Sequence, residues 1–231
     1  MSNKKAFVLS GYRGVPIYGD ITYSSSPSTE LALFVHGFKG FKDWGAHHLI
    51  ADYFAQHGVT FIKFNFSHSG VSAEDPNDIT DMDLFATNTP SGELEDLDIV
   101  LEFIAGNFPE ASLSLIGHSR GGGLPILKAA TSPMVKKLIT WAAIDDFRDL
   151  WGRDKEMEWE ERKQFEIYNG RTKTYMPLDI SVLHDVLKNS VKLDIKHAAQ
   201  ELKKPWLIIN GDQDPAVAGS NGECAGPEQD G

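Results

Sequence analysis

Residues 112–124 read SLSLIGHSRGGGL, and this stretch decides the fold. Its apolar first half is typical of a buried strand, and a helical segment follows its glycines. Between the two, Ser119 lies in the pattern G-x-S-x-G, flanked by Gly117 and Gly121. Small residues allow a sharp turn from strand to helix, which lifts the Ser119 hydroxyl above the carboxyl edge of a sheet. The following helix aims its first amide groups at the same point, where they can stabilise an oxyanion.

Apolar runs alternate with helical patterns from residue 31 onward, which is typical of a parallel sheet covered on both faces. The predicted strands are 31–37, 59–66, 112–119, 137–144 and 205–212. Two short β-prone pieces before residue 24 predict antiparallel edge strands that lead into this core. The predicted fold class is therefore α/β, with a mostly parallel, doubly wound sheet.

Two helices are predicted between these strands. The first presents a stripe at Ile50, Tyr53, Phe54 and His57 and ends at Gly58. The second presents an apolar face in residues 97–104, and we expect a serine, Ser91, to cap its start.

Residues 147–200 interrupt the alternation with a long segment rich in charged and aromatic residues. A strand should return sooner than this, so the segment predicts an inserted helical lid. Its amphipathic stripe is Val182, Leu183, Val186 and Leu187. We expect most of its aromatic side chains to form the core of the lid and a minority to contact ligand; they are Trp151, Trp159, Phe165, Tyr168 and Tyr175.

Composition narrows the classes of function. The 33 acidic and 22 basic residues give a net charge of −11, which disfavours nucleic acid and anionic membrane surfaces as partners. No apolar run is long enough for a membrane span, and the start is too polar for a signal peptide. A single cysteine, Cys224, excludes an internal disulfide. We expect a cytoplasmic protein of one domain, residues 1–217, that uses no metal or cofactor.

A second loop supplies what acyl chemistry at Ser119 would need. The sequence HGFKG, residues 36–40, follows the strand at 31–35. A tetrahedral intermediate needs two convergent amide donors, and the candidates are the backbone amides of Phe38 and Arg120. We expect His36 and His118 to bond neighbouring backbone, whereas the Arg120 side chain could pair with an acid or contact substrate.

The sequence INGDQDPAV, residues 209–217, places two aspartates after the last predicted strand. In this order, HGFKG, GHSRGG and GDQDPAV resemble the α/β-hydrolase superfamily, over about residues 5–217. The length of the insert is similar to that of the cinnamoyl or feruloyl esterase branch. The resemblance implies that Ser119 is the nucleophile, that the Phe38 and Arg120 amides form the oxyanion hole, and that Asp214 is the acid. Asp212 is then a turn residue.

Two further aspartates, Asp145 and Asp146, follow the strand at 137–144 and are alternative acids. The family order of Ser, Asp and His fails at its last member, because no histidine follows Asp214. We expect residues 218–231 to be a disordered tail and the chain to be an interrupted esterase that lacks its last helix and strand. His184 and His197, in the insert, are candidate substitute bases.

The sequence thus predicts a serine hydrolase that cleaves small-molecule carboxylic esters through an acyl-enzyme. Its turnover should be impaired because a triad member is missing. A peptidase or acyltransferase on the same fold is one alternative. The other is a binding protein on a hydrolase scaffold, without turnover.

Overall fold

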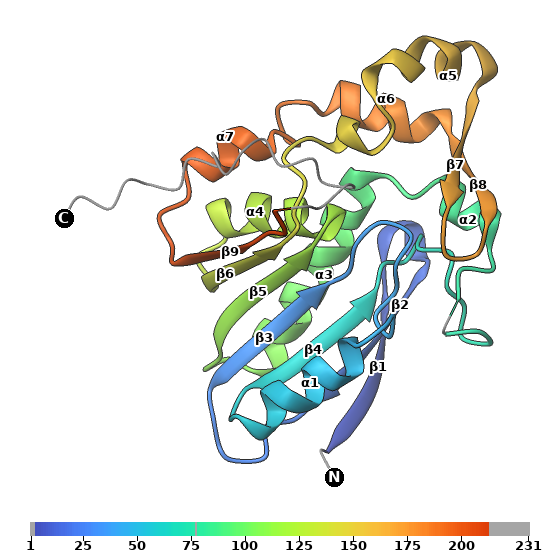
Figure 1. Cartoon of the computed structure of the whole chain (residues 1–231). Helices are drawn as coiled ribbons and strands as arrows, with labels where there is room; N and C mark the ends of the chain where they lie inside the picture. Colours follow the sequence, from blue (N-terminus) through green and yellow to red (C-terminus); the bar gives the residue numbers. More distant parts are fainter. Residues whose placement is uncertain (1–2, 77, 213–231) are drawn as a thin grey trace.

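A computed structural model describes residues 3–76 and 78–212 (Figure 1). The central sheet has the strand order β1-β2-β4-β3-β5-β6-β9. These strands are β1 (Lys4–Ser10), β2 (Pro16–Thr22), β3 (Glu30–Val35), β4 (Thr60–Asn65), β5 (Ser112–His118), β6 (Val135–Trp141) and β9 (Trp206–Ile209). β2 pairs antiparallel with both β1 and β4, whereas the pairs from β4 to β9 are parallel. The predicted parallel core with an antiparallel N-terminal edge is confirmed.

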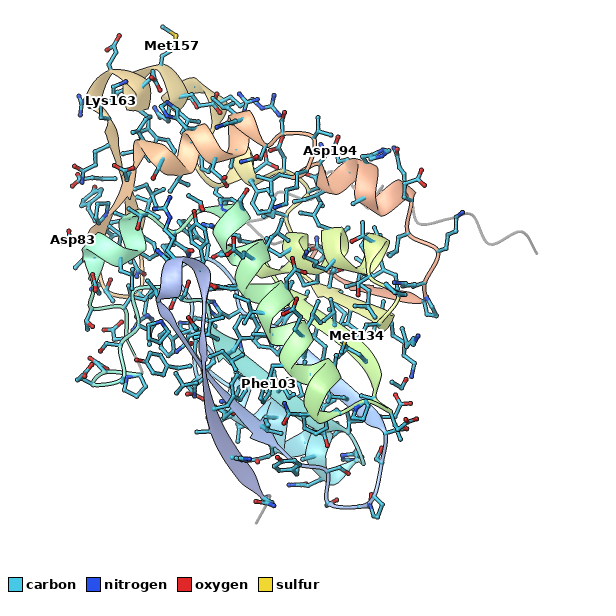
Figure 2. All side chains as sticks on the ribbon, turned by 180° about the vertical axis from the view of Figure 1, so that it is seen from behind. Asp83, Phe103, Met134, Met157, Lys163 and Asp194 are labelled. Carbon is cyan, nitrogen blue, oxygen red and sulfur yellow. The ribbon has the colours of Figure 1, made fainter. Side chains whose placement is uncertain are left out.

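Alternate side chains of the central strands enter two separate hydrophobic clusters, one on each face of the sheet. Ala32 and Phe34 of β3 pack with α1 (His47–Gln56). Leu31 and Leu33 pack instead with residues of α3 (Pro90–Asn107) and α4 (Arg120–Thr131). Figure 1 shows α1 on the near face of the sheet, and Figure 2 shows α3 and α4 across the opposite face. Burial on both faces explains why these strands are apolar almost throughout.

The first helix exists, but its predicted face is only partly right. Ile50 and Phe54 of the predicted stripe are partly buried and pack on the sheet cluster, whereas the buried residues of α1 are His47, Ala51 and Ala55, the last two one position after Ile50 and Phe54. Tyr53 is 61% exposed. Small alanine side chains let the helix lie close to the aromatic rings of the sheet, so the large residues flank the contact instead of filling it.

The N-cap of the second helix lies two residues before the predicted one. Thr89 is the N-cap of α3, and its hydroxyl accepts a hydrogen bond from the Gly92 amide at 3.2 Å. Pro90 occupies the first turn, where its missing N–H has no intrahelical partner to lose. Ser91 therefore lies inside the helix and does not cap it.

The segment between β6 and β9 was predicted to be helical, but it also contains strands. Its helices are the 3₁₀ turns η2 (Phe147–Leu150) and η3 (Arg153–Lys155), α5 (Glu156–Arg162), α6 (Ile180–Lys188) and α7 (Ile195–Gln200). Between α5 and α6 it also contains an antiparallel hairpin, β7 (Gln164–Asn169) and β8 (Thr174–Asp179). Side chains alternate along the hairpin, with Ile167, Met176 and Leu178 buried. Strands repeat every two residues and helices every 3.6, so the hairpin does not show the helical pattern that was predicted for this segment.

The aromatic residues of this segment divide into two groups. Trp151 and Trp159 are buried and pack edge to face at 5.2 Å between ring centroids, and Phe165 adjoins Trp159. Tyr168 and Tyr175 form an exposed pair across the hairpin, with ring centroids 5.4 Å apart. The first group therefore forms a core, as expected, whereas the second faces solvent.

The hairpin docks on loops at the carboxyl edge of the sheet (Figure 1). The Lys39 ammonium donates a hydrogen bond to the Tyr168 carbonyl at 3.0 Å. Arg171, in the hairpin turn, pairs with Asp78 at 2.5 Å. Strand β8 also lies against α2 (Met82–Ala86). Far-separated parts of the sequence thus meet above the end of β3.

The turn from β5 into α4 depends on close backbone contacts. A methyl group added at Gly121 would lie 2.0 Å from the His36 carbonyl oxygen. One added at Gly117 would lie 2.2 Å from the Gly121 oxygen and 2.8 Å from the Pro125 ring. Because the colliding atoms are mostly backbone, no side-chain rotation can relieve the overlap. The two glycines of G-x-S-x-G are therefore required by packing, and α4 continues past Pro125 without a break.

We predict that Gly121→Ala lowers the free energy of unfolding by about 3 kcal/mol or more, because the added methyl group overpacks a rigid backbone contact. Urea denaturation measures the change. The matched control is Gly106→Ala in α3, where an added methyl group meets nothing within 4 Å. This control should stabilise the protein by up to about 1 kcal/mol through helix propensity. Equal effects of the two substitutions would contradict the packing argument.

Candidate active site

The carboxyl ends of five parallel strands meet at one edge of the sheet. The loops that leave β3, β4, β5, β6 and β9 all start there, and Ser119 follows β5 directly. In open α/β sheets this edge is where ligands bind. The candidate residues predicted from separate motifs are thereby brought to one place, with the exception of Asp214, which lies outside the described residues.

Ser119 occupies a strained turn. Its backbone angles are φ 55° and ψ −125°, a combination that side-chain-bearing residues rarely adopt. The Ser119 amide donates to the Trp141 carbonyl at 2.9 Å, and its carbonyl accepts from the Gly122 amide at 2.8 Å. The Ile144 amide donates to the same carbonyl at 3.3 Å. Hydrogen bonds to β6 and the loop after it therefore hold this conformation in place.

The HGFKG loop lies against the serine. A methyl group added at Gly37 would stand 3.0 Å from Ser119 Cβ. The loop turns back on itself there, since the Gly40 amide donates to the Gly37 carbonyl at 3.1 Å. Within residues 3–76 and 78–212, the amides of Phe38 and Arg120 donate to no backbone carbonyl. Phe38 follows Gly37 in the chain and Arg120 follows Ser119, so both amides belong to residues next to the contact between the HGFKG loop and the serine.

The Arg120 side chain turns away from solvent into a buried polar network. Its Nε donates to Glu93 Oε2 at 2.9 Å, and its Nη2 donates to the Asn88 carbonyl at 2.9 Å. Asn88 Nδ2 in turn donates to Glu93 Oε1 at 2.8 Å. Burial raises the pKa of Glu93, while the Arg120 guanidinium opposes that rise. Of the two roles left open for Arg120, this pairing with an acid is the one observed.

The sequence did not single out Glu93 as the partner of Arg120. Glu93 lies in the first turn of α3, near the positive end of the helix dipole, which is in itself a favourable place for an acid. It is nevertheless only 3% exposed, and Asn88 is 4% exposed. Glu93 and Arg120 are 27 residues apart in the sequence, and no local pattern connects them.

The histidines at the edge have structural partners. His36 Nδ1 lies 2.9 Å from the Gly37 carbonyl, and its Nε2 accepts from the Phe66 amide at 3.4 Å. The His118 ring packs on the Trp141 ring, with centroids 4.8 Å apart. The expected backbone bond is present for His36.

The two substitute bases lie in helices of the segment between β6 and β9. His184 Nε2, in α6, is 2.8 Å from Glu160 Oε2 in α5. His197, in α7, receives its helix-capping contact from Asp194, whose side chain accepts from the His197 amide at 2.9 Å. His184 would have to leave Glu160 before acting on Ser119.

The alternative acids make contacts in the same segment. Asp145 pairs with Lys196 at 3.3 Å. Asp146 caps η2 through the Arg148 amide at 2.9 Å and pairs with Arg153 at 2.6 Å. Both carboxylates therefore tie the loop after β6 to the insert. Asp212 is exposed just beyond β9.

Metal-binding clusters and membrane-spanning helices are both absent from the part of the chain that the structure describes. No group of three or more His, Cys, Asp or Glu side chains there could hold a metal ion. No helix there combines the length and the apolar character needed to cross a bilayer.

Comparison with solved structures places this arrangement in a known fold. The esterase domain of a Rhodothermus marinus protein matches 93% of this chain and 79% of its own, with a TM-score of 0.63 and 18% identity. Est1E from Butyrivibrio proteoclasticus, with ferulic acid bound, matches 92% of this chain and 81% of its own (TM-score 0.67, 18% identity). The alpha/beta hydrolase GrgF from Penicillium sp. sh18 matches 93% and 82% (TM-score 0.68, 14% identity).

No family model and no curated protein matches the sequence significantly. At these identities the structural likeness concerns the fold alone. The chain has the α/β-hydrolase fold, and the resemblance seen in its three motifs is confirmed at that level.

The buried His36 generates a prediction about pH. Burial is the largest cause that lowers its pKa from 6.5 to about 4; the neighbouring His47, Arg120 and His118 contribute to this shift, and the hydrogen bond to Gly37 opposes it. The unfolded chain takes up a proton near pH 6.5, whereas folded His36 does so only near pH 4, so its stabilising contribution is present above 6.5 and is lost on acidification. Between about pH 7 and about pH 5, this loss amounts to about 2 kcal/mol.

We therefore predict that His36→Gln reduces the acid sensitivity of folding. Urea denaturation gives the free energy of unfolding of the native chain and of the variant near pH 7 and near pH 5. The change between the two pH values is then compared between the two proteins. A general loss of packing lowers stability equally at the two pH values and is removed by that subtraction. An unchanged pH dependence in the variant would contradict the assignment of a neutral His36.

Proposed function

We propose that this α/β-hydrolase fold cleaves small carboxylic esters, with Ser119 as the nucleophile. The observation that carries the proposal is the strained Ser119 turn, and the amides of the adjoining Phe38 and Arg120 donate to no backbone carbonyl of the described residues. Strain of this kind persists where the surrounding structure enforces it, and it is concentrated at functional sites. A protein that only bound ligands would need neither feature.

In the proposed reaction the Ser119 oxygen attacks the acyl carbonyl carbon and the hydroxyl proton leaves to a base. The Phe38 and Arg120 amides donate hydrogen bonds to the resulting oxyanion, helped by the positive end of α4. Collapse of the intermediate breaks the ester C–O bond, releases the alcohol and leaves an acyl-enzyme. Water then adds to the acyl carbon, the bond from that carbon to the Ser119 oxygen breaks, the oxygen regains a proton, and the carboxylic acid is released.

The base that takes the Ser119 proton has no assigned residue in the proposed mechanism. Of the two candidate substitute bases, His184 is engaged with Glu160. We propose that solvent takes the proton when residues 1–231 are assayed by themselves, so that turnover is low. Without one triad member, catalysis by an oxyanion hole and substrate binding still exceeds the uncatalysed rate by about 10³–10⁴-fold.

An activated ester makes this residual catalysis measurable, because its leaving group needs no protonation. We predict that the chain hydrolyses p-nitrophenyl acetate above buffer background and that Ser119→Ala abolishes the excess. The matched control is Ser67→Ala, since Ser67 is buried at the same edge and its hydroxyl lies 2.8 Å from His68 Nδ1. This control should retain the activity within about threefold, as expected for loss of one hydrogen bond. Activity that survives Ser119→Ala would refute the assignment.

The type of bond cleaved separates this proposal from its alternatives. Amide hydrolysis demands protonation of a poor leaving group, for which the proposed machinery has no acid. We predict that an aminoacyl p-nitroanilide is not cleaved under conditions that cleave the ester. Cleavage of both would indicate a peptidase. Binding of esters without any Ser119-dependent release of product would indicate a binding protein.

For the acyl group we propose a phenolic acid. Support comes from the fold shared with Est1E, which has been solved with ferulic acid bound, and from the exposed Tyr168 and Tyr175 rings on the hairpin that Lys39 contacts. Aromatic rings provide flat apolar contact area for such a ligand. Comparison of methyl ferulate with methyl acetate tests this proposal independently of the nucleophile.

A further inference from the structure

The Arg120 guanidinium joins three segments that are distant in sequence. It extends from the first residue of α4 and bonds Glu93 in α3 and the carbonyl of Asn88 between α2 and α3. Its central carbon also lies 4.9 Å from the centroid of the Phe38 ring, in the loop after β3. A planar group with donors in fixed directions can make all three contacts at once.

The Phe38 ring has a second buried neighbour. It stacks on Phe85 of α2 with ring centroids 5.6 Å apart and planes at 24°. Phe85 is 1% exposed, and Arg120 is also 1% exposed. The Phe38 side chain therefore contacts one buried aromatic ring and one buried cation, and the Lys39 ammonium also lies 5.9 Å from its ring centroid.

The network is costly to bury and is satisfied internally. Glu93 uses both carboxylate oxygens, one for Arg120 and one for Asn88. Taking two charges out of water costs more than a well-packed apolar pair, unless geometry and hydrogen bonding are good. Such a pair is retained for what it positions rather than for stability alone.

We propose that the Arg120 side chain is a positioning residue, which fixes the distance between the two oxyanion-hole amides. One of these amides is its own and the other belongs to Phe38, so that the two donors carry side chains that contact each other. Oxyanion donors stabilise a transition state to the extent that they are fixed in advance. This inference rests on the proposed function. It adds a reason why the residue that follows Ser119 is an arginine.

The test uses phenylboronic acid with the full chain. Its boron bonds to the serine oxygen while the hydroxyl proton leaves to solvent, which gives an anionic tetrahedral adduct. One boron-bound hydroxyl of the adduct occupies the oxyanion position, so its affinity reports on the two amides without turnover. Titration calorimetry measures this affinity, and p-nitrophenyl acetate hydrolysis gives kcat and KM. Thermal denaturation establishes that each variant is folded at the working temperature.

Two variants disturb the contact between the Arg120 guanidinium and the Phe38 ring, which we call the clamp, and both keep the backbone amides of the two residues. Arg120→Lys keeps the charge for Glu93 but loses the planar contacts, and Phe38→Leu removes the ring. Each variant should weaken the binding of phenylboronic acid about tenfold or more. Each should also lower kcat about tenfold or more and leave KM unchanged, because small misplacements of catalytic groups have large effects on rate. Together they should do less than the product of their single effects, because they disturb one contact.

If Arg120→Lys fails to fold, the double variant Arg120→Met with Glu93→Gln replaces it, because removing both charges leaves neither buried alone. The matched control is Lys128→Met, which removes another cation of α4 and its pair with Asp98 at 2.5 Å. Lys128 lies two turns further along the helix, so boronate affinity and kcat should stay unchanged.

Each outcome decides between the two proposals. Unchanged boronate affinity in folded Arg120 and Phe38 variants overturns the positioning role, and a fall in thermal stability alone does the same. If Ser119→Ala binds phenylboronic acid as tightly as the native chain, or the native chain does not bind it, the proposed function fails and this inference fails with it. Loss of binding in Ser119→Ala, with graded losses in the clamp variants, supports both.

Discussion

The close approach of the first turn of α4 to the end of β3 is the constraint on which the site depends. Gly121 has no room for a side chain beside the His36 carbonyl, and Gly117 has none beside the Gly121 carbonyl. This proximity forces the chain to leave β5 and enter the helix within one residue, so Ser119 takes the strained angles. The same proximity brings Gly37, and with it the HGFKG loop, against the serine. The close backbone contacts thus bring Ser119 and the HGFKG loop together without any contribution from charged side chains.

Buried charges then fix the loops around that turn. Arg120 with Glu93 ties α4 to α3, and Asp96 accepts the amides of Tyr12 and Ser67 at 2.7 Å each. Carboxylates that receive hydrogen bonds from loop amides hold irregular backbone in one conformation, since breaking them would leave a charge or an amide unsatisfied in the interior. Rigid surroundings are what preorganised amide donors require.

The segment between β6 and β9 contributes a different kind of contact. Its hairpin reaches the carboxyl edge through the Lys39 bond to the Tyr168 carbonyl, while Arg148 and Glu156 hold its helical part together at 2.5 Å. Several of its other ion pairs lie on the surface and contribute little to stability. Its attachment to the sheet also has an extensive apolar part, since α7 packs on α4 through Ile195, the side chains of Phe147 and Trp151 lie in the main core, and α6 presents an apolar face to α3. That face is Val182, Leu183 and Val186, as predicted, while Leu187 is 45% exposed.

The sequence by itself determined the parallel strands and the glycine-flanked Ser119 turn, because apolar runs and small residues encode them locally. Only the tertiary structure decided the partner of Arg120, the burial of Glu93 and the buried face of α1, since each depends on which distant element packs there. The hairpin was missed for a related reason: its two-residue period is short, and half of its side chains face solvent. Local geometry is specified by neighbours in sequence, whereas the environment of a charge is specified by the whole fold.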